Sequence, residues 1–256
     1  VFVLIWSTGF IVARYGMPYA PPFTFLLWRY FFSILCFLPW ILLARVAWPR
    51  DRRQVLHLAV TGMLMHAGYL GGVWAAVRAG MGSGLSSLIV GIQPVLTAIW
   101  LSTMTRSEGH ATVSRRQWLG LLLGFAGLVM VVSRKFTQGT PLDHVTPGNM
   151  GWAVMALLAI TSGTLYQKRF VLPCDVRTAN TVQLVAAALV TLPLAWLEPQ
   201  GMQWNGQLMG AMAWSVLGLT LGGSSLLYLL IQRGAAATVA SLMYLVPPTT
   251  ALIAWV

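Results

Sequence analysis

Charged side chains are scarce in this sequence. Of 256 residues, 8% are charged and 57% are hydrophobic, whereas soluble domains carry about 25% charged and 45–50% apolar residues. A soluble fold could not cover so much apolar surface with so few charged groups. The composition therefore predicts an all-α integral membrane protein.

Acidic residues are the scarcest charged class, with five Asp and Glu against 16 Lys and Arg. All five fall in or at the edge of segments between the long apolar runs: Asp51, Glu108, Asp143, Asp175 and Glu198. Carriers of cations and many proton-coupled carriers need a carboxylate inside the membrane. We therefore expect permanent cations to be poor substrates, and we expect no carboxylate-based proton coupling. Only His66 could serve as a proton site.

Cysteine is rarer still, and the two cysteines lie in different kinds of segment. Cys36 lies in an apolar run and Cys174 in a basic loop, so we expect no disulfide. No Cys/His cluster has metal-ligand spacing, and we expect neither metal nor cofactor.

The formal net charge is +11, but no basic face with interleaved aromatics suggests a nucleic-acid partner. The expected partners are the lipid bilayer and a small-molecule substrate.

Long apolar runs recur nine times along the chain. They span residues 1–13, 23–44, 55–77, 83–102, 117–133, 149–166, 178–197, 207–231 and 235–256. A helix needs about 20 residues to cross the ~30 Å hydrocarbon core. The first run is shorter than this, so we expect it to be a helix that lacks its N-terminal third.

The distribution of Lys and Arg predicts the topology. Loops after the even-numbered runs hold 11 of these residues, and loops after the odd-numbered runs hold four. Basic residues concentrate in cytoplasmic loops. The even loops and the N-terminus are therefore expected to be cytoplasmic, in a multi-pass protein of the inner membrane.

A shift of 154 residues superimposes many landmarks. Leu38-Pro39 meets Leu192-Pro193, Pro94 meets Pro248, and runs 1–4 meet runs 6–9. Five runs separate equivalent positions, so the second half would enter the membrane inverted, as in many secondary transporters. We expect a first repeat over residues 1–135 and a second over 147–256 whose fifth helix, the tenth overall, is missing. The alternative is a chance similarity of two apolar halves.

Several motifs resemble those of a known family. They are Trp6-Ser7-Thr8-Gly9-Phe10, Leu27-Trp28-Arg29-Tyr30, Ile92-Gln93-Pro94 and Leu245-Val246-Pro247-Pro248-Thr249-Thr250-Ala251. Together they resemble the EamA-type branch of the drug/metabolite transporter superfamily. The resemblance implies ten helices in two inverted five-helix repeats and the movement of small metabolites, often outward. We expect the protein not to be an enzyme.

Polar and aromatic residues at helical spacing suggest a substrate cavity. Thr220, Ser224 and Tyr228 share one helix face, and the repeat maps them onto His66, Leu70 and Trp74. The alternative is helix–helix packing through hydroxyl groups. The predicted substrate contacts are Trp6, His66, Tyr69, Trp74, Gln93, Thr161, Ser224, Tyr228 and Tyr244. Prolines inside helices free backbone groups, so Pro94, Pro247 and Pro248 are predicted kink positions.

Arg29, six residues into the second run, leaves alternatives open. It could snorkel to the extracytoplasmic surface, bind a structural partner, or attract an anionic substrate group.

The predicted function is export of a small neutral or zwitterionic, amino-acid-like metabolite. A nucleotide-sugar carrier would want more cationic groups. A membrane enzyme would need a carboxylate or a nucleophile–base pair that the runs lack. Substrate identity, coupling ion and oligomeric state stay open.

Overall fold

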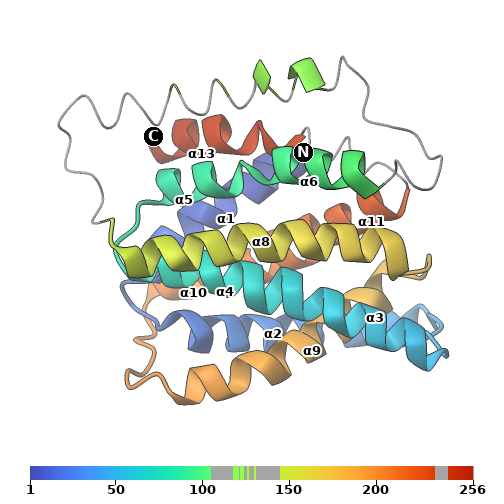
Figure 1. Ribbon diagram of the computed structural model, residues 1–256. Helices are drawn as coiled ribbons and strands as arrows, with labels where there is room; N and C mark the ends of the chain where they lie inside the picture. The colour runs from blue at the N-terminus through green and yellow to red at the C-terminus, as the bar shows by residue number, and fades with distance from the viewer. Residues whose placement is uncertain are drawn as a thin grey trace.

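The computed structural model describes residues 1–104, 145–233 and 242–255, together with short helical pieces between 118 and 130. Within these residues all regular structure is helical. The helices lie side by side as a bundle (Figure 1). The expected all-α membrane fold is confirmed.

The helices of the first half begin with α1 (Phe2–Gly16) and α2 (Pro22–Leu43). A continuous segment follows, made of α3 (Arg52–Gly62), the π-helix η1 (Met63–Leu70) and α4 (Gly71–Arg78). The next two are α5 (Ser83–Val90) and α6 (Gln93–Met104). The helix α1 extends three residues beyond the expected end of the first run.

The second half repeats this order. It consists of α8 (Pro147–Phe170), α9 (Val176–Trp196), a continuous segment of α10 (Gly206–Trp214), η3 (Ser215–Ser224) and α11 (Ser225–Gln232), and finally α13 (Val246–Trp255). Among the described residues, five helical segments are long and apolar enough to cross a membrane: 22–43, 52–78, 83–100, 176–196 and 206–232. The run expected at 117–133 lies mostly outside the described residues, so the number of spans stays a prediction.

The shift of 154 residues relates the boundaries of these helices. It carries α2 onto residues 176–197, where α9 lies, and carries 52–78 onto 206–232, the bounds of the α10–η3–α11 segment. It also carries η1 onto residues 217–224, inside η3. The π-helix is rare in proteins, so its recurrence at matched positions supports the predicted repeat.

The described acidic residues stabilise helix starts. Asp51 and Asp175 accept hydrogen bonds from backbone N–H groups at the first turns of α3 and α9. The Glu198 carboxylate accepts from the N–H groups of Phe23 and Thr24 at 3.0 and 2.7 Å, at the start of α2. Carboxylates offset the positive end of the helix dipole. Each of these three acids therefore lies outside the membrane-spanning segments.

Two helices are interrupted close to the predicted prolines. The break between α5 and α6 falls at Gly91–Ile92, just before Pro94. The turn at Tyr244–Leu245 precedes α13, which contains Pro247 and Pro248 near its start. A Cβ atom on Gly91 would lie 2.9 Å from the Pro247 ring. The two breaks therefore pack directly against each other, and their role as hinges stays a prediction.

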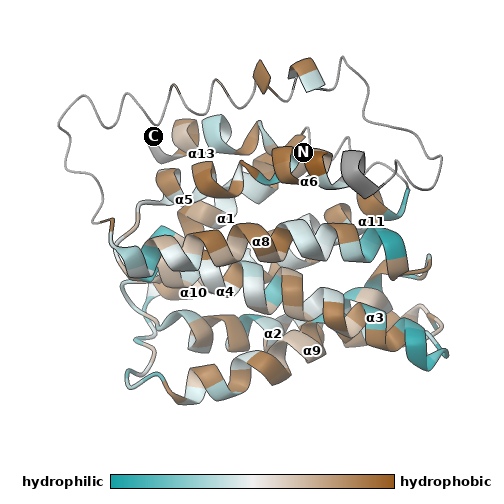
Figure 2. Ribbon diagram, in the orientation of Figure 1, coloured by the Kyte–Doolittle hydropathy of each residue, from teal (hydrophilic) through white to brown (hydrophobic). Residues whose placement is uncertain are grey.

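The loops gather at two ends of the bundle. In Figure 1 the loops between α1 and α2 and between α9 and α10 lie at the left, and those between α2 and α3 and between α8 and α9 lie at the right. Most described Lys and Arg residues lie in or beside the loops at the right end: Arg45, Arg50, Arg52, Arg53, Lys168, Arg169, Arg177 and Arg233. Figure 2 shows polar residues at these ends and hydrophobic residues along the helices between them.

Close packing of α4 against α8 generates a stability prediction. A Cβ atom on Gly72 would lie 2.6 Å from the Trp152 carbonyl oxygen and 2.9 Å from the Ala156 Cβ. Overpacking costs roughly 1–3 kcal/mol, so Gly72→Ala should lower the melting temperature of the detergent-solubilised protein.

Gly151→Ala provides the matched control, because a Cβ atom there meets nothing within 4 Å. This change should leave the melting temperature unchanged or raise it, since alanine favours helix by about 1 kcal/mol over glycine. Equal melting temperatures for the two variants would show that the close helix approach is wrong.

Candidate functional site

A buried cavity of about 40 Å³ lies between helices of both halves. Its lining comes from α1, α2, η1, α4, α8, α9, η3 and α11: Trp6, Gly9, Phe10, Arg29, Met65, His66, Tyr69, Leu70, Val73, Trp74, Gln167, Gln183, Leu219, Ser224, Leu227 and Tyr228. Such a volume holds a few water molecules, whereas ligand pockets usually measure about 300–1,000 Å³. A metabolite would therefore need the surrounding helices to move apart.

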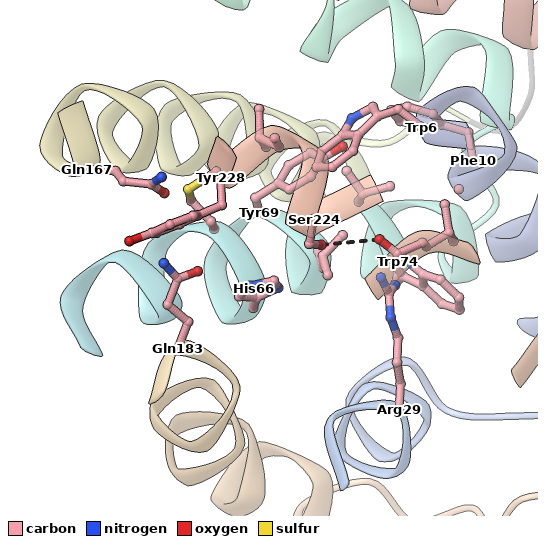
Figure 3. Close-up of a pocket in the computed structure, with 16 residues that line it drawn as sticks. Trp6, Phe10, Arg29, His66, Tyr69, Trp74, Gln167, Gln183, Ser224 and Tyr228 are labelled. Carbon is pink, nitrogen blue, oxygen red and sulfur yellow. Dashed lines mark hydrogen bonds between the residues drawn. The ribbon is translucent and has the colours of Figure 1, made fainter. Parts of the chain in front are cut away.

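Aromatic rings form the wall of the cavity. Trp6 and Tyr69 stack with their ring centroids 6.1 Å apart and their planes 2° from parallel. Trp74 stacks on Phe25 with centroids 4.5 Å apart. Figure 3 shows Trp6, Tyr69 and Trp74 arranged around the central space. Stacked rings resist rotation, so this wall has a defined shape.

Arg29 is the cation of the cavity. Its side chain, 2% exposed, reaches from α2 to η3, where Nε donates a hydrogen bond to Thr220 Oγ1 at 2.9 Å. The Thr220 hydroxyl in turn donates to the Ser215 carbonyl oxygen at 3.0 Å. The snorkelling alternative for Arg29 is therefore wrong, because a hydroxyl acceptor inside the bundle holds the guanidinium there.

Gln183 holds the corresponding position in the second half. The shift of 154 residues carries Arg29 onto Gln183 and carries His66 onto Thr220. Gln183 points from α9 toward His66, in the same way that Arg29 reaches toward η3 (Figure 3). The Gln183 Nε2 atom is buried and has no hydrogen-bond partner. It is therefore free to donate to a ligand.

Much of the cavity lining consists of residues that the shift pairs with each other. These pairs are Arg29 with Gln183, Met65 with Leu219, Leu70 with Ser224, Val73 with Leu227, and Trp74 with Tyr228. A cavity lined by positions of both halves that the shift pairs lies between those halves. This is where inverted-repeat transporters bind their substrates.

The structure brings six of the nine predicted contacts together at this cavity: Trp6, His66, Tyr69, Trp74, Ser224 and Tyr228. The other three lie elsewhere. Gln93 donates a hydrogen bond from Nε2 to Thr164 Oγ1 at 3.2 Å, between α6 and α8. Thr161 lines a separate groove of about 500 Å³ between these helices. Tyr244 lies half-buried at the break before α13.

Sequence reasoning missed Gln167 and Gln183 as cavity residues. The repeat offered a signal for Gln183, because its equivalent Arg29 was itself a candidate.

The regular helical spacing assumed for Thr220, Ser224 and Tyr228 was also wrong. Through η3, the hydroxyls of Thr220 and Ser224 donate to carbonyl oxygens five residues earlier, at 3.0 and 3.3 Å. The wider turn places Thr220 beneath Arg29 instead of on the cavity wall.

One end of the bundle is closed by a cluster around Cys174, which we call the Cys174 cluster. The Cys174 thiol lies 3.0 Å from the Tyr228 hydroxyl, and its carbonyl oxygen accepts from Gln232 Nε2 at 3.0 Å. Gln54 donates from Nε2 to the Leu172 carbonyl oxygen at 2.7 Å and accepts from the Leu172 N–H at 3.0 Å. These bonds join the α8–α9 loop to α3 and α11, beside cavity residue Tyr228. Nearby, hydrogen bonds from Arg177 lower the pKa of the Asp175 carboxyl.

The opposite end is closed by a second cluster, which we call the Arg78 cluster. The Arg78 guanidinium donates to the Met17 carbonyl oxygen and, at 2.6 Å, to Gln200 Oε1. The shift of 154 residues carries Arg78 onto Gln232. In both halves, the last turn of the third helical segment thus donates to the carbonyl of the loop between the first two helices. The two clusters lie at opposite ends of the bundle, and their donors Arg78 and Gln232 hold equivalent positions.

Comparison with known proteins identifies the family. The sequence profile of the EamA-like transporter family matches residues 1–133, which is more than half of the chain. The chain belongs to the EamA-like transporter family. The resemblance predicted from the helix motifs is confirmed.

Curated relatives of this EamA-like protein carry transporter names. It is 26% identical over 191 residues to the "Uncharacterized inner membrane transporter YedA" of Escherichia coli K12, and the match covers 74% of this chain and 58% of YedA. It is 23% identical over 251 residues to the "Uncharacterized transporter YvbV" of Bacillus subtilis, covering 96% and 77% of the two chains. The chain thus spans less than two thirds of the length of YedA.

A protein of known crystal structure shares the fold of this EamA-like chain. The TM-score is 0.77 at 16% sequence identity, and the match covers 98% of this chain and 84% of the other. At this identity the likeness concerns the fold alone.

The Cys174 cluster generates a labelling prediction. In a Cys36→Ser background, Gln54→Ala should raise the rate at which a maleimide labels Cys174. Gln54→Ala removes two hydrogen bonds to Leu172, each worth about 1 kcal/mol, so the opened loop should be at least about fivefold more populated. The rate is measured on the purified protein in detergent.

Gln203→Ala serves as the control, because Gln203 is an exposed residue of the same type near the Arg78 cluster. It should leave the labelling rate unchanged. If both variants label at the rate of the parent, the hydrogen bonds of Gln54 do not restrain the α8–α9 loop.

Proposed function

We propose that this protein is a secondary transporter that exports a small neutral or zwitterionic, amino-acid-like metabolite across the inner membrane. The cavity lined by equivalent residues of the two halves carries this proposal. It lies inside the bundle, combines aromatic walls with a few polar groups, and draws its lining from eight helical segments. Such composition suits a small ligand with an apolar body and polar ends.

Alternating access is the mechanism that this arrangement supports. The Cys174 cluster and the Arg78 cluster close opposite ends of the bundle with hydrogen bonds at equivalent positions. Each can be broken without breaking the other, because they share no residue. Opening one cluster at a time would expose the cavity to one side and then to the other, around the packed helix breaks at Gly91–Ile92 and Tyr244–Leu245.

The cavity chemistry favours amino-acid-like substrates over nucleotide sugars. Arg29 is the one Lys or Arg that lines it among the described residues, whereas binding two phosphates calls for several cationic donors. The described residues also place no carboxylate in the cavity, so a permanent cation would meet no counter-charge. Exchange or facilitated diffusion fits this lining better than carboxylate-based proton coupling.

Orientation follows from charge. The end that carries the Cys174 cluster also carries most of the described basic loop residues. We place this end and the N-terminus in the cytoplasm. The name of the relative YedA, an inner membrane transporter, supports the assignment to the inner membrane.

Counterflow in proteoliposomes tests the proposed function. Vesicles loaded with unlabelled leucine, serine or phenylalanine should accumulate the same labelled amino acid transiently for at least one of the three, because a carrier exchanges substrate. Accumulation should persist when the pH gradient is collapsed. Trp6→Ala, in the cavity wall, should reduce it about tenfold or more, the effect expected for loss of a buried aromatic contact.

Trp28→Ala is the matched control, because Trp28 is 41% exposed on α2. It should retain the exchange rate of the parent protein. No exchange of any of these amino acids, or equal losses in the two variants, would contradict the proposed site.

Reciprocal labelling tests alternating access. In the Cys36→Ser background, Arg78→Ala weakens the Arg78 cluster and should favour opening at that end. The Cys174 cluster would then stay closed for longer, so labelling of Cys174 should become slower. Gln232→Ala, the equivalent change at the other end, should make it faster. Faster labelling in both variants would indicate general loosening and contradict the mechanism.

A further inference from the structure

Arg29 is a buried cation that is only partly paired. Its side chain is 2% exposed, and among the described residues its only hydrogen bond runs from Nε to Thr220 Oγ1. A guanidinium carries five N–H donors. The terminal Nη1 and Nη2 groups therefore donate no hydrogen bond to the described part of the chain, although Arg29 lines the cavity.

The described acidic residues are engaged elsewhere. Asp51 and Asp175 cap α3 and α9, and Asp175 also pairs with Arg177 at 2.8 Å. The Glu198 carboxylate accepts from Phe23, from the Thr24 N–H and from the Thr24 hydroxyl at the start of α2. Thus none of the described carboxylates neutralises Arg29.

An unneutralised charge inside a membrane protein is costly and points to a function. The two Nη groups of an arginine match the two oxygens of a carboxylate, which can accept parallel hydrogen bonds from them. We propose that Arg29 binds the carboxylate of the transported metabolite, with Thr220 fixing the guanidinium in the orientation that leaves Nη1 and Nη2 facing the cavity. This inference rests on the proposed transport function and names the substrate class of the same site.

A second donor lies across the same cavity. The Gln183 Nε2 group is buried without a hydrogen-bond partner, and Gln183 occupies the position equivalent to Arg29. Figure 3 shows the two side chains entering the cavity from neighbouring helices, with His66 and Ser224 between them. The Gln183 amide can donate from Nε2 and accept at Oε1, so it can bind a second polar group of the substrate, such as an ammonium, while an apolar part contacts Trp6 and Tyr69. A small carboxylic acid with one further polar group has this chemistry.

Thermal stability of the purified full chain tests the assignment with simple carboxylates as probes. Sodium formate and sodium acetate should raise the melting temperature of the parent protein more than sodium chloride does at equal ionic strength, since ligands stabilise the state that they bind. Arg29→Gln should abolish this difference. The ligand-free Arg29→Gln protein should also melt at a higher temperature than the parent, because the uncompensated charge is gone. If Arg29 served only to hold the fold together, Arg29→Gln would lower the melting temperature instead.

Two variants control for net charge and for position. Arg14→Gln removes one positive charge from an exposed site and should leave the carboxylate effect intact. Arg29→Lys keeps the charge but loses the paired donors, so carboxylate stabilisation should survive only in part. Equal stabilisation of the parent by chloride and by formate, no stabilisation by either carboxylate, or a lower melting temperature of ligand-free Arg29→Gln would overturn the proposal.

Transport assays separate this inference from the proposed function. Counterflow should occur with leucine and not with isopentylamine, which lacks the carboxylate, or with leucinamide, which replaces it by an amide. Arg29→Gln should weaken leucine exchange about 30-fold or more, as expected for truncation of a buried charged contact. Exchange of isopentylamine would overturn the carboxylate-binding role of Arg29 and leave the transport function standing. Carboxylate stabilisation without exchange of any compound would contradict the transport function and leave the anion site in place.

Discussion

The cost of keeping polar groups away from water determines the arrangement of this molecule. A bilayer offers no hydrogen-bond partners, so a buried polar atom left without one inside the protein is costly unless it lines a cavity. The described carboxylates satisfy this constraint at helix starts, and Thr220 and Ser224 satisfy it through carbonyl oxygens of the π-helix η3. Arg29 and Gln183 have donors without a partner among the described residues, and of the buried polar groups in this situation these two line the cavity. These two side chains are therefore placed to meet a ligand.

The predicted repeat gives this constraint a mechanical consequence. The shift of 154 residues relates the cavity walls, the two π-helices, and the Arg78 and Gln232 side chains that hold the loops at the two ends. A closure that exists twice, once at each end, allows the same rearrangement to occur in either half. The cavity of about 40 Å³ is too small for most metabolites. Its enlargement is therefore coupled, in this account, to the opening of one closure.

Much of the fold could be predicted from composition and periodicity. Apolar runs and Lys/Arg counts predicted the helices and their two ends, because hydrophobic length and loop charge are local properties of the sequence. The gap-free shift predicted matched helix bounds for the same reason. The π-helices could not be predicted, since their hydrogen-bond pattern depends on packing around residues such as Ser215 and Leu219. The first run also proved longer than expected, because α1 continues to Gly16.

The candidate site was predicted only in part. Trp6, His66 and Tyr228 line the cavity as expected, because polar and aromatic residues within apolar helices tend to face the interior. Gln93 fulfils the same criterion and instead bonds Thr164 between two helices. Which buried polar group meets a neighbour and which meets a cavity depends on helix rotation, and the sequence pattern does not specify it to the residue. The sequence also left open whether Arg29 faces the membrane surface or the interior, and its hydrogen bond to Thr220 shows that it faces the interior.

The distances across the two ends test the central claim most directly, namely that they open alternately around one cavity. Spin labels at Ala79 and Pro199 would report the end of the Arg78 cluster, and labels at Arg53 and Pro173 the end of the Cys174 cluster. All four positions are exposed, and both native cysteines would be replaced by serine. In nanodiscs, we expect each pair to show a short and a long distance, with substrate shifting the two populations in opposite directions. Two ends that lengthen together, or a single fixed distance at both, would contradict the account.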